Sequence, residues 1–350
     1  MVRKRKLQSA VFQRKKMKTY NNLWEQFISI ENFVKAYKDA RRGKGKQRTV
    51  AEFRNGWALK LYKLRKDVIA GKFHTSKYKS EVIYEPKKRT IYKLPFNPDR
   101  IVQHAVMNVL APILERKFIT DSYACIPGRG QLKASQRCMQ AVRRNKYCLK
   151  CDIHHFYPSI DQKILSGMYH KIIADNRFMA VLDDIIFSFP GGKNAPIGNY
   201  ISQWSGNFYL TPLDNFVKRE LKIKDYLRYC DDFLLFSNDK KYLHECRKKI
   251  RQFLKENLLL EYSKADVFDV KQGVDFCGYR HFNNFVLLRK STKLREQKKI
   301  AEIKQAMESG NFDADRLRSS IDSILGWMKH AKTYKLKQKY MLYELRKSVA

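Results

Sequence analysis

The sequence predicts an α+β fold, in which strands and helices follow one another without a regular βαβ repeat. Three segments carry the strand signal. Residues 78–96 alternate apolar and polar side chains around a Pro-Lys-Lys-Arg turn, which predicts a β-hairpin. Residues 147–153 predict a short buried strand, and residues 226–236 predict two short strands on either side of an acidic tip. Most of the remaining segments have the apolar spacing of helices.

The other expected elements follow in chain order. Residues 1–20 form a basic arm, which is expected to be partly disordered on its own. Residues 21–70 predict helices, joined by a basic, glycine-containing loop at 41–46. A further helix is expected to follow Asp99, with Arg100 at its start. Beyond it, helices are expected at residues 160–187, 240–257 and 291–350, with a return to strand at 273–289.

The composition is strongly basic. The chain has 72 lysines and arginines against 34 aspartates and glutamates, so its net charge is +38. Such an excess destabilises a compact state by self-repulsion, and a polyanion is therefore expected to neutralise it. The phosphate backbone of a nucleic acid is the best candidate. A membrane surface is the alternative, but no basic amphipathic helix with a clean apolar face supports it.

Cysteine usage and hydropathy indicate a cytoplasmic protein. The cysteines number seven, and most lie in apolar stretches, which predicts reduced thiols instead of a disulfide framework. Cys148 and Cys151 have the spacing of a zinc knuckle, but no second pair accompanies them. The basic N-terminus lacks the apolar segment of a secretory signal. No apolar run approaches the roughly 20 residues that a membrane helix needs.

The acidic tip, YCDD, is the most specific feature of the sequence. It places Asp231 and Asp232 between apolar strand segments, where adjacent carboxylates are costly unless a cation offsets them. A second acidic strand end is Asp152, which ends the run Tyr147-Cys148-Leu149-Lys150-Cys151 and is followed by Ile153. If the strands are neighbours in one sheet, Asp152 and Asp231 converge on two divalent ions about 3.5–4 Å apart, the usual device for in-line phosphoryl transfer. Oxygen ligands favour Mg²⁺, with Mn²⁺ as its substitute. The alternative is a hairpin turn that happens to be acidic.

Several ordered segments resemble the motifs of reverse transcriptases. LKCDIHHFYPSI resembles the first palm motif, and YCDD resembles the hairpin motif. PKKRTIYKLPFNPDRIVQHAV resembles the fingers segment, and DSYACIPGRGQLKA resembles the motif in which basic residues meet the template. Residues 257–264 resemble the palm lysine motif, and FCGY at 276–279 resembles the primer grip. YxDD alone is a weak motif, but the ordered set over residues 75–290 is specific. It implies an RNA-directed DNA polymerase.

This resemblance implies a right-hand polymerase fold with fingers, a palm and a helical thumb. The palm would be an antiparallel sheet flanked by helices, and the lysine-rich thumb would grip the template–primer duplex by its phosphates. The expected regions are an N-terminal arm with helices at 1–70, fingers at 71–146, a palm at 147–285 and a thumb at 286–350. Residues 190–212 form a segment between fingers and palm.

The resemblance carries over to catalytic residues one by one. Asp152, Asp231 and Asp232 match the family's catalytic carboxylates. Successive strand side chains point to opposite faces, so Asp231 is expected to be the bridging metal ligand and Asp232 a weaker one. The carbonyl of Ile153 is a further expected metal ligand. Lys264 matches a palm lysine that protonates the leaving pyrophosphate.

Other residues match positions that contact the substrates. Lys88 and Arg89 match fingers residues that clamp the triphosphate, a task suited to the planar fork of arginine; the alternative is a solvated basic turn. Tyr157 matches the bulky residue that excludes a 2′-hydroxyl, which would make the product DNA. Here the alternative is a core aromatic, because only one of Phe156 and Tyr157 can face the nucleotide. Arg100 is expected near the template and not in catalysis.

Residues 197–203 narrow the subfamily. They read IGNYISQ, where most bacterial relatives have Gln-Gly, three residues and Ser-Pro. Ile197 and Gln203 resemble the enzymes of diversity-generating retroelements, which copy a template-repeat RNA with errors at adenines so that the cDNA replaces a variable repeat. Gly198 permits close approach to the template base or dNTP. Gln203 is expected to contact the sugar or the templating base, with a helix-start pattern as the alternative. Ile197 and Gln203 are the expected sites of lost fidelity.

The same resemblance implies partners. They are the template RNA, the cDNA–RNA hybrid, dNTPs and a basic, pentameric accessory variability protein, in the cytoplasm of a bacterial or phage-infected cell. Two alternatives stay open. One is a group II intron-like or defence-associated reverse transcriptase. The other is a catalytically inactive RNA-binding scaffold, against which the intact pair of Asp152 and Asp231 argues.

Overall fold

A computed structural model describes residues 19–84, 88–310 and 312–349. The chain divides into two compact units. The first comprises Met1–Ile113 and Ile160–Ser205, and the second comprises Leu114–Ser159 and Gly206–Ala350. The predicted basic arm lies outside the described residues except for its last two positions. Helices and antiparallel sheets occur together, so the predicted α+β class is confirmed.

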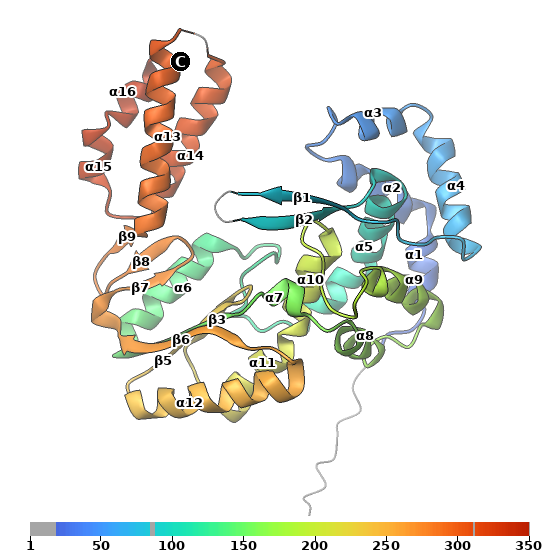
Figure 1. Ribbon diagram of the computed structural model, residues 1–350, viewed down its shortest axis with the longest axis horizontal. Helices are drawn as coiled ribbons and strands as arrows, with labels where there is room; N and C mark the ends of the chain where they lie inside the picture. The colour runs from blue at the N-terminus through green and yellow to red at the C-terminus, as the bar shows by residue number, and fades with distance from the viewer. Residues whose placement is uncertain (1–18, 85–87, 311, 350) are drawn as a thin grey trace, which may run out of the picture. The chain divides into compact units, whose positions relative to one another are not determined.

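The first unit is mainly helical (Figure 1). An edge-to-face contact between Phe27, near the N-terminus of the unit, and Phe178, in the helix Asn176–Phe187, has ring centroids 5.5 Å apart. It packs the first helix of the unit against this later helix. The predicted helices over 21–70 and after Asp99 are confirmed. The helices of this unit are α1 (Leu23–Ile28), α2 (Ile30–Arg41), α3 (Arg48–Arg54), α4 (Trp57–Ile69), most of α5 (Ile101–Glu115), α8 (Gln162–His170), α9 (Asn176–Phe187) and the first part of α10 (Tyr200–Tyr209).

The helix expected over 160–187 is two helices, α8 and α9. Residues 171–175 interrupt it although no glycine or proline marks the break. Tyr20 pairs with Ile173 in an isolated bridge, which takes up backbone groups that a continuous helix would use. The Asp175 side chain then accepts a hydrogen bond from the Phe178 amide at 3.1 Å and caps α9.

The predicted hairpin is present as β1 (Lys79–Ile83) and β2 (Arg89–Lys93). Its antiparallel register runs from Lys79 opposite Lys93 to Ile83 opposite Arg89. Both strands are largely exposed. A backbone hydrogen bond of 2.8 Å, from the Tyr92 amide to the Ile197 carbonyl, ties the hairpin to the segment that precedes α10.

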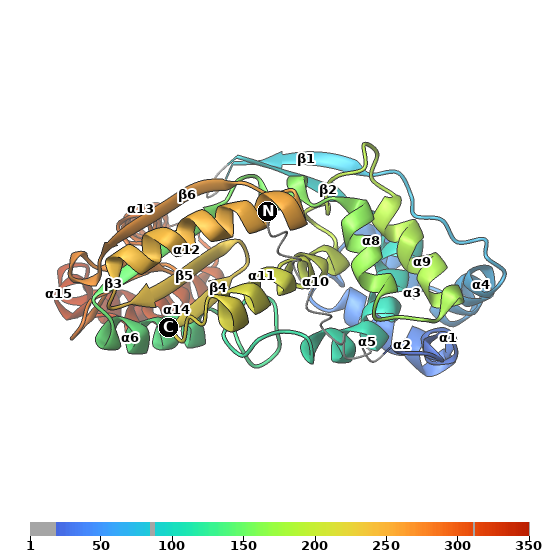
Figure 2. The same cartoon turned by 90° about the horizontal axis from the view of Figure 1, so that it is seen from below.

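A four-stranded antiparallel sheet is the centre of the second unit. It contains β3 (Tyr147–Ile153), β4 (Tyr226–Tyr229), β5 (Asp232–Ser237) and β6 (Tyr262–Asp269), in the order β4-β5-β3-β6. The helix α12 (Lys240–Phe253) contacts β3, β5 and β6, and runs along the sheet in Figure 2. The helix α6 (Gln131–Arg144) packs Cys138 against Cys148 and Leu234 in one buried cluster. Helices on both faces explain why β3 buries Cys148 on one side and Leu149 and Cys151 on the other.

The C-terminal part of this unit begins with a second antiparallel sheet. Its strands are β7 (Val274–Phe276), β8 (Tyr279–His281) and β9 (Val286–Leu288), so the strand signal over 273–289 represents three short strands. Gly278 lies between β7 and β8 with a φ of 82°, and an added Cβ would meet the Trp327 ring at 2.7 Å. Both the backbone conformation and the close ring therefore require glycine there.

The lysine-rich helices predicted over 291–350 are also present. They share a core formed by Ile300, Ile321, Ile324 and Met328. These helices are α13 (Lys290–Glu308), α14 (Ala314–Lys329), α15 (Tyr334–Lys339) and α16 (Leu342–Lys347). The short helices α7 (Phe156–Ser159) and α11 (Thr211–Asn215) also belong to the second unit. None of the helices in the described ranges has the length and apolarity needed to cross a membrane.

One buried histidine makes the stability of the first unit depend on pH. His104 stacks on Tyr200, with ring centroids 4.4 Å apart and ring planes at 12°. Burial lowers the pKa of His104 to about 4; Asp39 opposes this shift, and the positive charges of Lys44, Arg100 and Lys35 add to it. The pKa is thus depressed in the folded state. Between pH 6.5 and 4 the unfolded chain binds more protons, so stability falls as the pH falls through this window.

His104→Phe keeps a stacked ring and removes the titrating group. We expect wild type to lose up to about 3 kcal/mol more unfolding free energy than this variant between pH 7 and pH 4. Urea denaturation at several pH values measures the difference. Exposed His330 provides the control, because His330→Phe should follow the wild-type profile. Parallel profiles for wild type and His104→Phe would contradict the prediction.

Candidate active site

The sheet register brings two of the predicted carboxylates to neighbouring strand ends. The ladder between β3 and β5 runs from Tyr147 opposite Ser237 to Cys151 opposite Phe233. Asp152 and Asp232 are the next residues on these two strands. Because side chains alternate along a strand, Asp152 lies on the same face of β3 as Cys148. The strands that carry the predicted site are therefore neighbours in one sheet.

The third carboxylate, Asp231, lies in the turn between β4 and β5. Tyr229 pairs with Asp232, so Cys230 and Asp231 form a two-residue hairpin loop. Cys230 has a φ of 55°, in the left-handed region that residues other than glycine rarely adopt. A positive φ at the first loop position matches the twist of the two strands. Asp231 therefore occupies the tip of the loop, whereas Asp232 begins β5.

Asp232 is paired with a lysine that the sequence analysis did not identify. The Lys150 ammonium lies 3.3 Å from Oδ2 of Asp232. The other oxygen, Oδ1, is buried and has no hydrogen-bond partner among the described residues. Burial raises the pKa of Asp232 to about 6; Lys150 opposes the rise, and the charges of Asp152 and Asp231 add to it. The only sequence signal for Lys150 is a charged residue inside an otherwise apolar strand.

Asp152 is held by a serine that the sequence analysis also missed. Ser263 Oγ donates a hydrogen bond of 2.6 Å to Oδ2 of Asp152 and one of 3.2 Å to its carbonyl oxygen. The ladder between β3 and β6 pairs Asp152 with Lys264 and then Ile153 with Tyr262, which leaves Ser263 as the extra residue of a β-bulge. The bulge directs Ser263 at the carboxylate. The same ladder places the predicted residue Lys264 directly opposite Asp152.

The aromatic pair after β3 is divided between the core and the surface. Phe156 is 3% exposed, whereas Tyr157 is partly exposed. An added Cβ on Gly206 of α10 would meet the two rings at 3.1–3.2 Å, so this glycine lets both pack closely. Burial raises the pKa of the Tyr157 phenol, whose oxygen also hydrogen-bonds the Cys230 thiol. Tyr157 is thus the member of the pair that a nucleotide could reach.

The Cys230 thiol has a second sulfur neighbour, Cys125. A hydrogen bond between the two thiols lowers the pKa of Cys125 to about 7 and raises that of Cys230. Cys125 is exposed, and its φ is also 55°.

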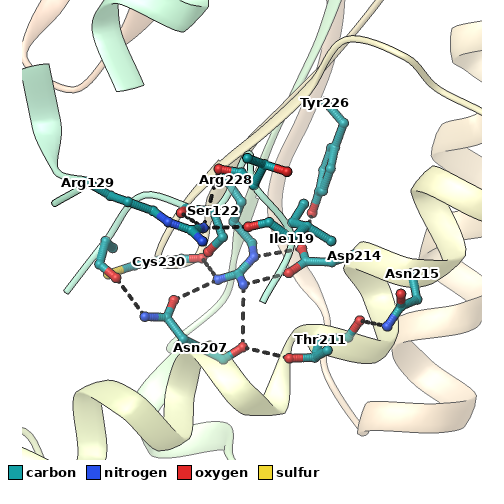
Figure 3. A network of polar contacts seen from close by, with 12 residues as sticks. Ile119, Ser122, Arg129, Asn207, Thr211, Asp214, Asn215, Tyr226, Arg228 and Cys230 are labelled. Carbon is teal, nitrogen blue, oxygen red and sulfur yellow. Dashed lines mark hydrogen bonds and ion pairs between the residues drawn. The ribbon is translucent and has the colours of Figure 1, made fainter. Parts of the chain in front are cut away.

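A buried ion pair lies beneath the hairpin loop (Figure 3). Arg228 on β4 and Asp214 on α11 are both fully buried, and two hydrogen bonds of 2.7 and 2.8 Å join the guanidinium to the carboxylate. Arg228 also donates to Oδ1 of Asn207 at 3.0 Å and to the Cys230 carbonyl at 3.1 Å. The Tyr226 hydroxyl donates to Asp214 at 2.8 Å. The network therefore fixes the backbone one residue before Asp231.

The donor atoms suit Mg²⁺ without forming a complete cage. Within residues 19–84, 88–310 and 312–349, no three Asp, Glu, His or Cys side chains are close enough to form a ready-made metal site. Mg²⁺ is usually bound by one or two carboxylates together with water and substrate phosphates, and not by an all-protein cage. The partnerless Oδ1 of Asp232, beside two further carboxylates, fits a site that the substrate completes.

The predicted substrate contacts in the first unit lie on or near the β1–β2 hairpin. Lys88 and Arg89 are exposed, Arg89 as the first residue of β2. Gly198 has a φ of 119°, and an added Cβ would lie 2.6 Å from the Tyr92 carbonyl oxygen. Packing against β2 therefore already requires this glycine, which is a reason that the sequence analysis did not consider. Gln203 is exposed in the first turn of α10.

A cavity of about 490 Å³ lies in the first unit beside Gly198. Its size is within the roughly 300–1,000 Å³ typical of small-ligand sites. Nε2 of Gln103 is buried at the cavity without a hydrogen-bond partner among the described residues. The half-buried Arg100 guanidinium also lines it, and no ion pair to Arg100 is found within the described ranges. Lys44, whose pKa is lowered by burial and by Arg100, adds a second cation nearby. This arrangement favours an anionic ligand with a polar, hydrogen-bonding part.

Comparisons with known proteins identify the family. The family model for "Reverse transcriptase (RNA-dependent DNA polymerase)" matches residues 79–281, more than half of the chain. Protein YkfC of Escherichia coli strain K12 is 24% identical over 327 residues, which cover 77% of this chain and 83% of that protein. The retron Ec73 reverse transcriptase of Escherichia coli is 26% identical over 201 residues, covering 53% of this chain and 61% of that protein. The chain therefore belongs to the reverse transcriptase family and is an RNA-directed DNA polymerase.

Proposed function

We propose that this reverse transcriptase acts in a diversity-generating retroelement, where it copies a template-repeat RNA with errors at adenines. The observation that carries the proposal is the segment 197–203, with Ile197 before the glycine and Gln203 after the serine. The Ile197 carbonyl accepts the Tyr92 amide at 2.8 Å, so this segment is bonded to the strand that begins with Arg89. A substitution at residue 197 is therefore expected to shift the backbone of β2, which carries Arg89 of the proposed triphosphate clamp.

For the chemical step, the proposal assigns Asp152 and Asp231 as metal ligands, with Asp232 and the Ile153 carbonyl as weaker ones. Bound Mg²⁺ would lower the pKa of the primer 3′-hydroxyl and offset the charge on the triphosphate. Ser263 orients Asp152, and Lys150 partly neutralises Asp232. This pairing agrees with Asp232 as the weaker ligand, because one of its oxygens is already engaged.

The remaining assignments concern the substrates. Lys264, opposite Asp152 on β6, is proposed to protonate the leaving pyrophosphate. Lys88 and Arg89 are proposed to hold the triphosphate. The cavity lined by Arg100 suits the phosphate and base of an unpaired template nucleotide. Gly198 lines the same cavity, so its predicted close approach to the template base or dNTP would occur there. Template RNA, the cDNA–RNA hybrid and dNTPs are the partners of these sites.

Tyr157→Val tests the proposed selection of deoxyribonucleotides. Removal of the ring opens space for a 2′-hydroxyl, so the preference for dNTPs over rNTPs should fall by about 10- to 100-fold. Single-nucleotide incorporation on an RNA template measures this ratio as kcat/KM. Tyr157→Phe is the matched control, since it keeps the ring and loses only the hydroxyl that contacts Cys230. An unchanged ratio in Tyr157→Val would show that another residue excludes the 2′-hydroxyl.

Ile197→Gln tests the proposed cause of infidelity. Restoring the residue common in bacterial relatives should return about 1–3 kcal/mol of discrimination, the size of one hydrogen-bonding contact, and lower adenine misincorporation about tenfold or more. The measurement is sequencing of cDNA made on the cognate RNA. Ile197→Leu controls for the substitution itself. If wild type makes no excess of errors at adenines, the retroelement function is wrong while the polymerase activity stands.

The similarity to a retron reverse transcriptase favours a second candidate, a non-mutagenic copying enzyme such as a group II intron-like or defence-associated one. Accurate cDNA from a structured RNA would support it. The mutagenic function also requires a partner, for which we propose a basic, pentameric accessory variability protein. Its addition should stimulate cDNA synthesis on template-repeat RNA and leave copying of a homopolymer template unchanged.

A further inference from the structure

Two thiols meet beside the hairpin loop that carries Asp231. Cys125 and Cys230 are hydrogen-bonded through their side chains. Both are free thiols, and neither belongs to the proposed metal ligands. The family match does not explain a paired cysteine here, because the catalytic role proposed for the loop rests on its carboxylates alone.

The backbone holds the two cysteines side by side. Ser122 pairs with Arg228 in a parallel bridge, and the Tyr123 amide donates to the Arg228 carbonyl at 3.0 Å. The segment that follows Ser122 therefore runs alongside the end of β4. Cys125 comes three residues after Ser122 and Cys230 two residues after Arg228, so the bridge brings both cysteines into the same part of the unit.

Side chains fix both segments at this point (Figure 3). Nδ2 of Asn207 donates to the Ala124 carbonyl at 2.7 Å, while Oδ1 of Asn207 accepts from Arg228 at 3.0 Å. Arg228 donates in turn to the Cys230 carbonyl at 3.1 Å. The buried Asn207 side chain thus connects the backbone of Ala124 to the Arg228 guanidinium, which in turn binds the backbone of Cys230. The packed network therefore fixes the backbone of both segments that carry the thiols.

Exposure distinguishes this pair from the other cysteines. Cys125 is exposed and Cys230 is partly exposed, whereas the remaining five are buried: Cys138, Cys148, Cys151, Cys246 and Cys277. An oxidant in solution therefore reaches Cys125 first, and the neighbour able to resolve the oxidised sulfur is Cys230.

We propose that Cys125 and Cys230 form a reversible disulfide that switches the polymerase off under oxidation. With hydrogen peroxide as oxidant, the Cys125 sulfur attacks one peroxide oxygen, and the O–O bond breaks to give a sulfenic acid and one water. The Cys230 sulfur then attacks the Cys125 sulfur and displaces a second water. Two thiols lose two electrons, and one peroxide is reduced to two waters. A dithiol reverses the step by thiol–disulfide exchange.

The disulfide changes the loop in two ways. It joins the residue before Asp231 covalently to the neighbouring segment, and it removes the Cys230 thiol from its hydrogen bond with Tyr157. The loss of activity rests on the proposed roles of Asp231 and Tyr157. Formation of the disulfide does not depend on them.

The test treats the purified full chain with a slight excess of hydrogen peroxide. We expect an intact mass lower by about 2 Da, from the two hydrogens lost, and a non-reduced peptide linking Cys125 to Cys230. Primer extension should fall at least tenfold and return with dithiothreitol. Cys125→Ser should keep basal activity and resist peroxide. Cys246→Ser, at a buried thiol, should be inactivated like wild type.

Three results would overturn the proposal. The first is absence of the linked peptide in oxidised wild type. The second is a linked peptide without loss of primer extension. The third is inactivation of Cys125→Ser to the wild-type extent, with Cys125→Ala as a second variant in case serine disturbs folding. If the chain extended no primer at all, the catalytic assignment would fail, and the linked peptide would still decide whether this is a modification site.

Discussion

Asp231→Asn is expected to lower the rate of primer extension on an RNA template by about a thousandfold or more. A carboxylate that binds catalytic metal ions supplies several kcal/mol of transition-state stabilisation, and each 1.36 kcal/mol corresponds to a factor of ten in rate. Asparagine has the size of aspartate and can occupy the second position of the hairpin loop, so the fold should survive. Single-turnover extension with saturating dNTP measures the chemical step directly.

Asp232→Asn provides a comparison within the same loop. Lys150 already engages one of its oxygens, so we expect a smaller loss than for Asp231→Asn. Glu220→Gln is the control for removing a negative charge elsewhere, because Glu220 is exposed. A wild-type rate for Asp231→Asn would exclude Asp231 as a metal ligand. A larger loss for Asp232→Asn would reverse the proposed order of the two ligands.

Local patterns in the sequence predicted much of the sheet. The apolar run at 147–153 has the same bounds as β3, and the segment 226–236 is nearly coincident with β4 and β5. These strands are buried on both faces, so their apolar runs are visible in a short window. Strand β6 was not predicted, because none of its residues is fully buried and three of its eight are charged, namely Lys264, Asp266 and Asp269. Helix α6 was likewise missed, since polar and basic residues surround its small apolar face.

The residues that support the site could not be predicted in the same way. Ser263 reaches Asp152 only because a β-bulge displaces it, and nothing in the sequence marks a bulge there. Lys150 becomes the partner of Asp232 through the pairing of two strands some 80 residues apart in the sequence. Such contacts depend on which distant strands pair, and no short window of the sequence shows that pairing. Motif matching found the carboxylates, whereas only the folded chain identifies the residues that orient them.

Arg228→Met is expected to have the largest effect on stability. It leaves Asp214 fully buried with the Tyr226 hydroxyl as its remaining donor, and removing one partner of a buried ion pair costs about 3–5 kcal/mol. Asn207 and the Cys230 carbonyl lose their donor as well. Chemical denaturation in urea, followed by circular dichroism, measures the loss of unfolding free energy.

A double variant, Arg228→Met with Asp214→Leu, separates the two consequences of this change. It removes both charges together, and well-packed apolar replacements of a buried ion pair are often neutral or stabilising, so most of the lost stability should return. The Cys230 carbonyl would still lack its donor. If Arg228 positions the hairpin loop, the double variant stays folded yet extends primers more slowly, with kcat reduced more than KM is raised. Full recovery of kcat together with stability would show that the ion pair supports the fold alone and that the loop positions Asp231 without it.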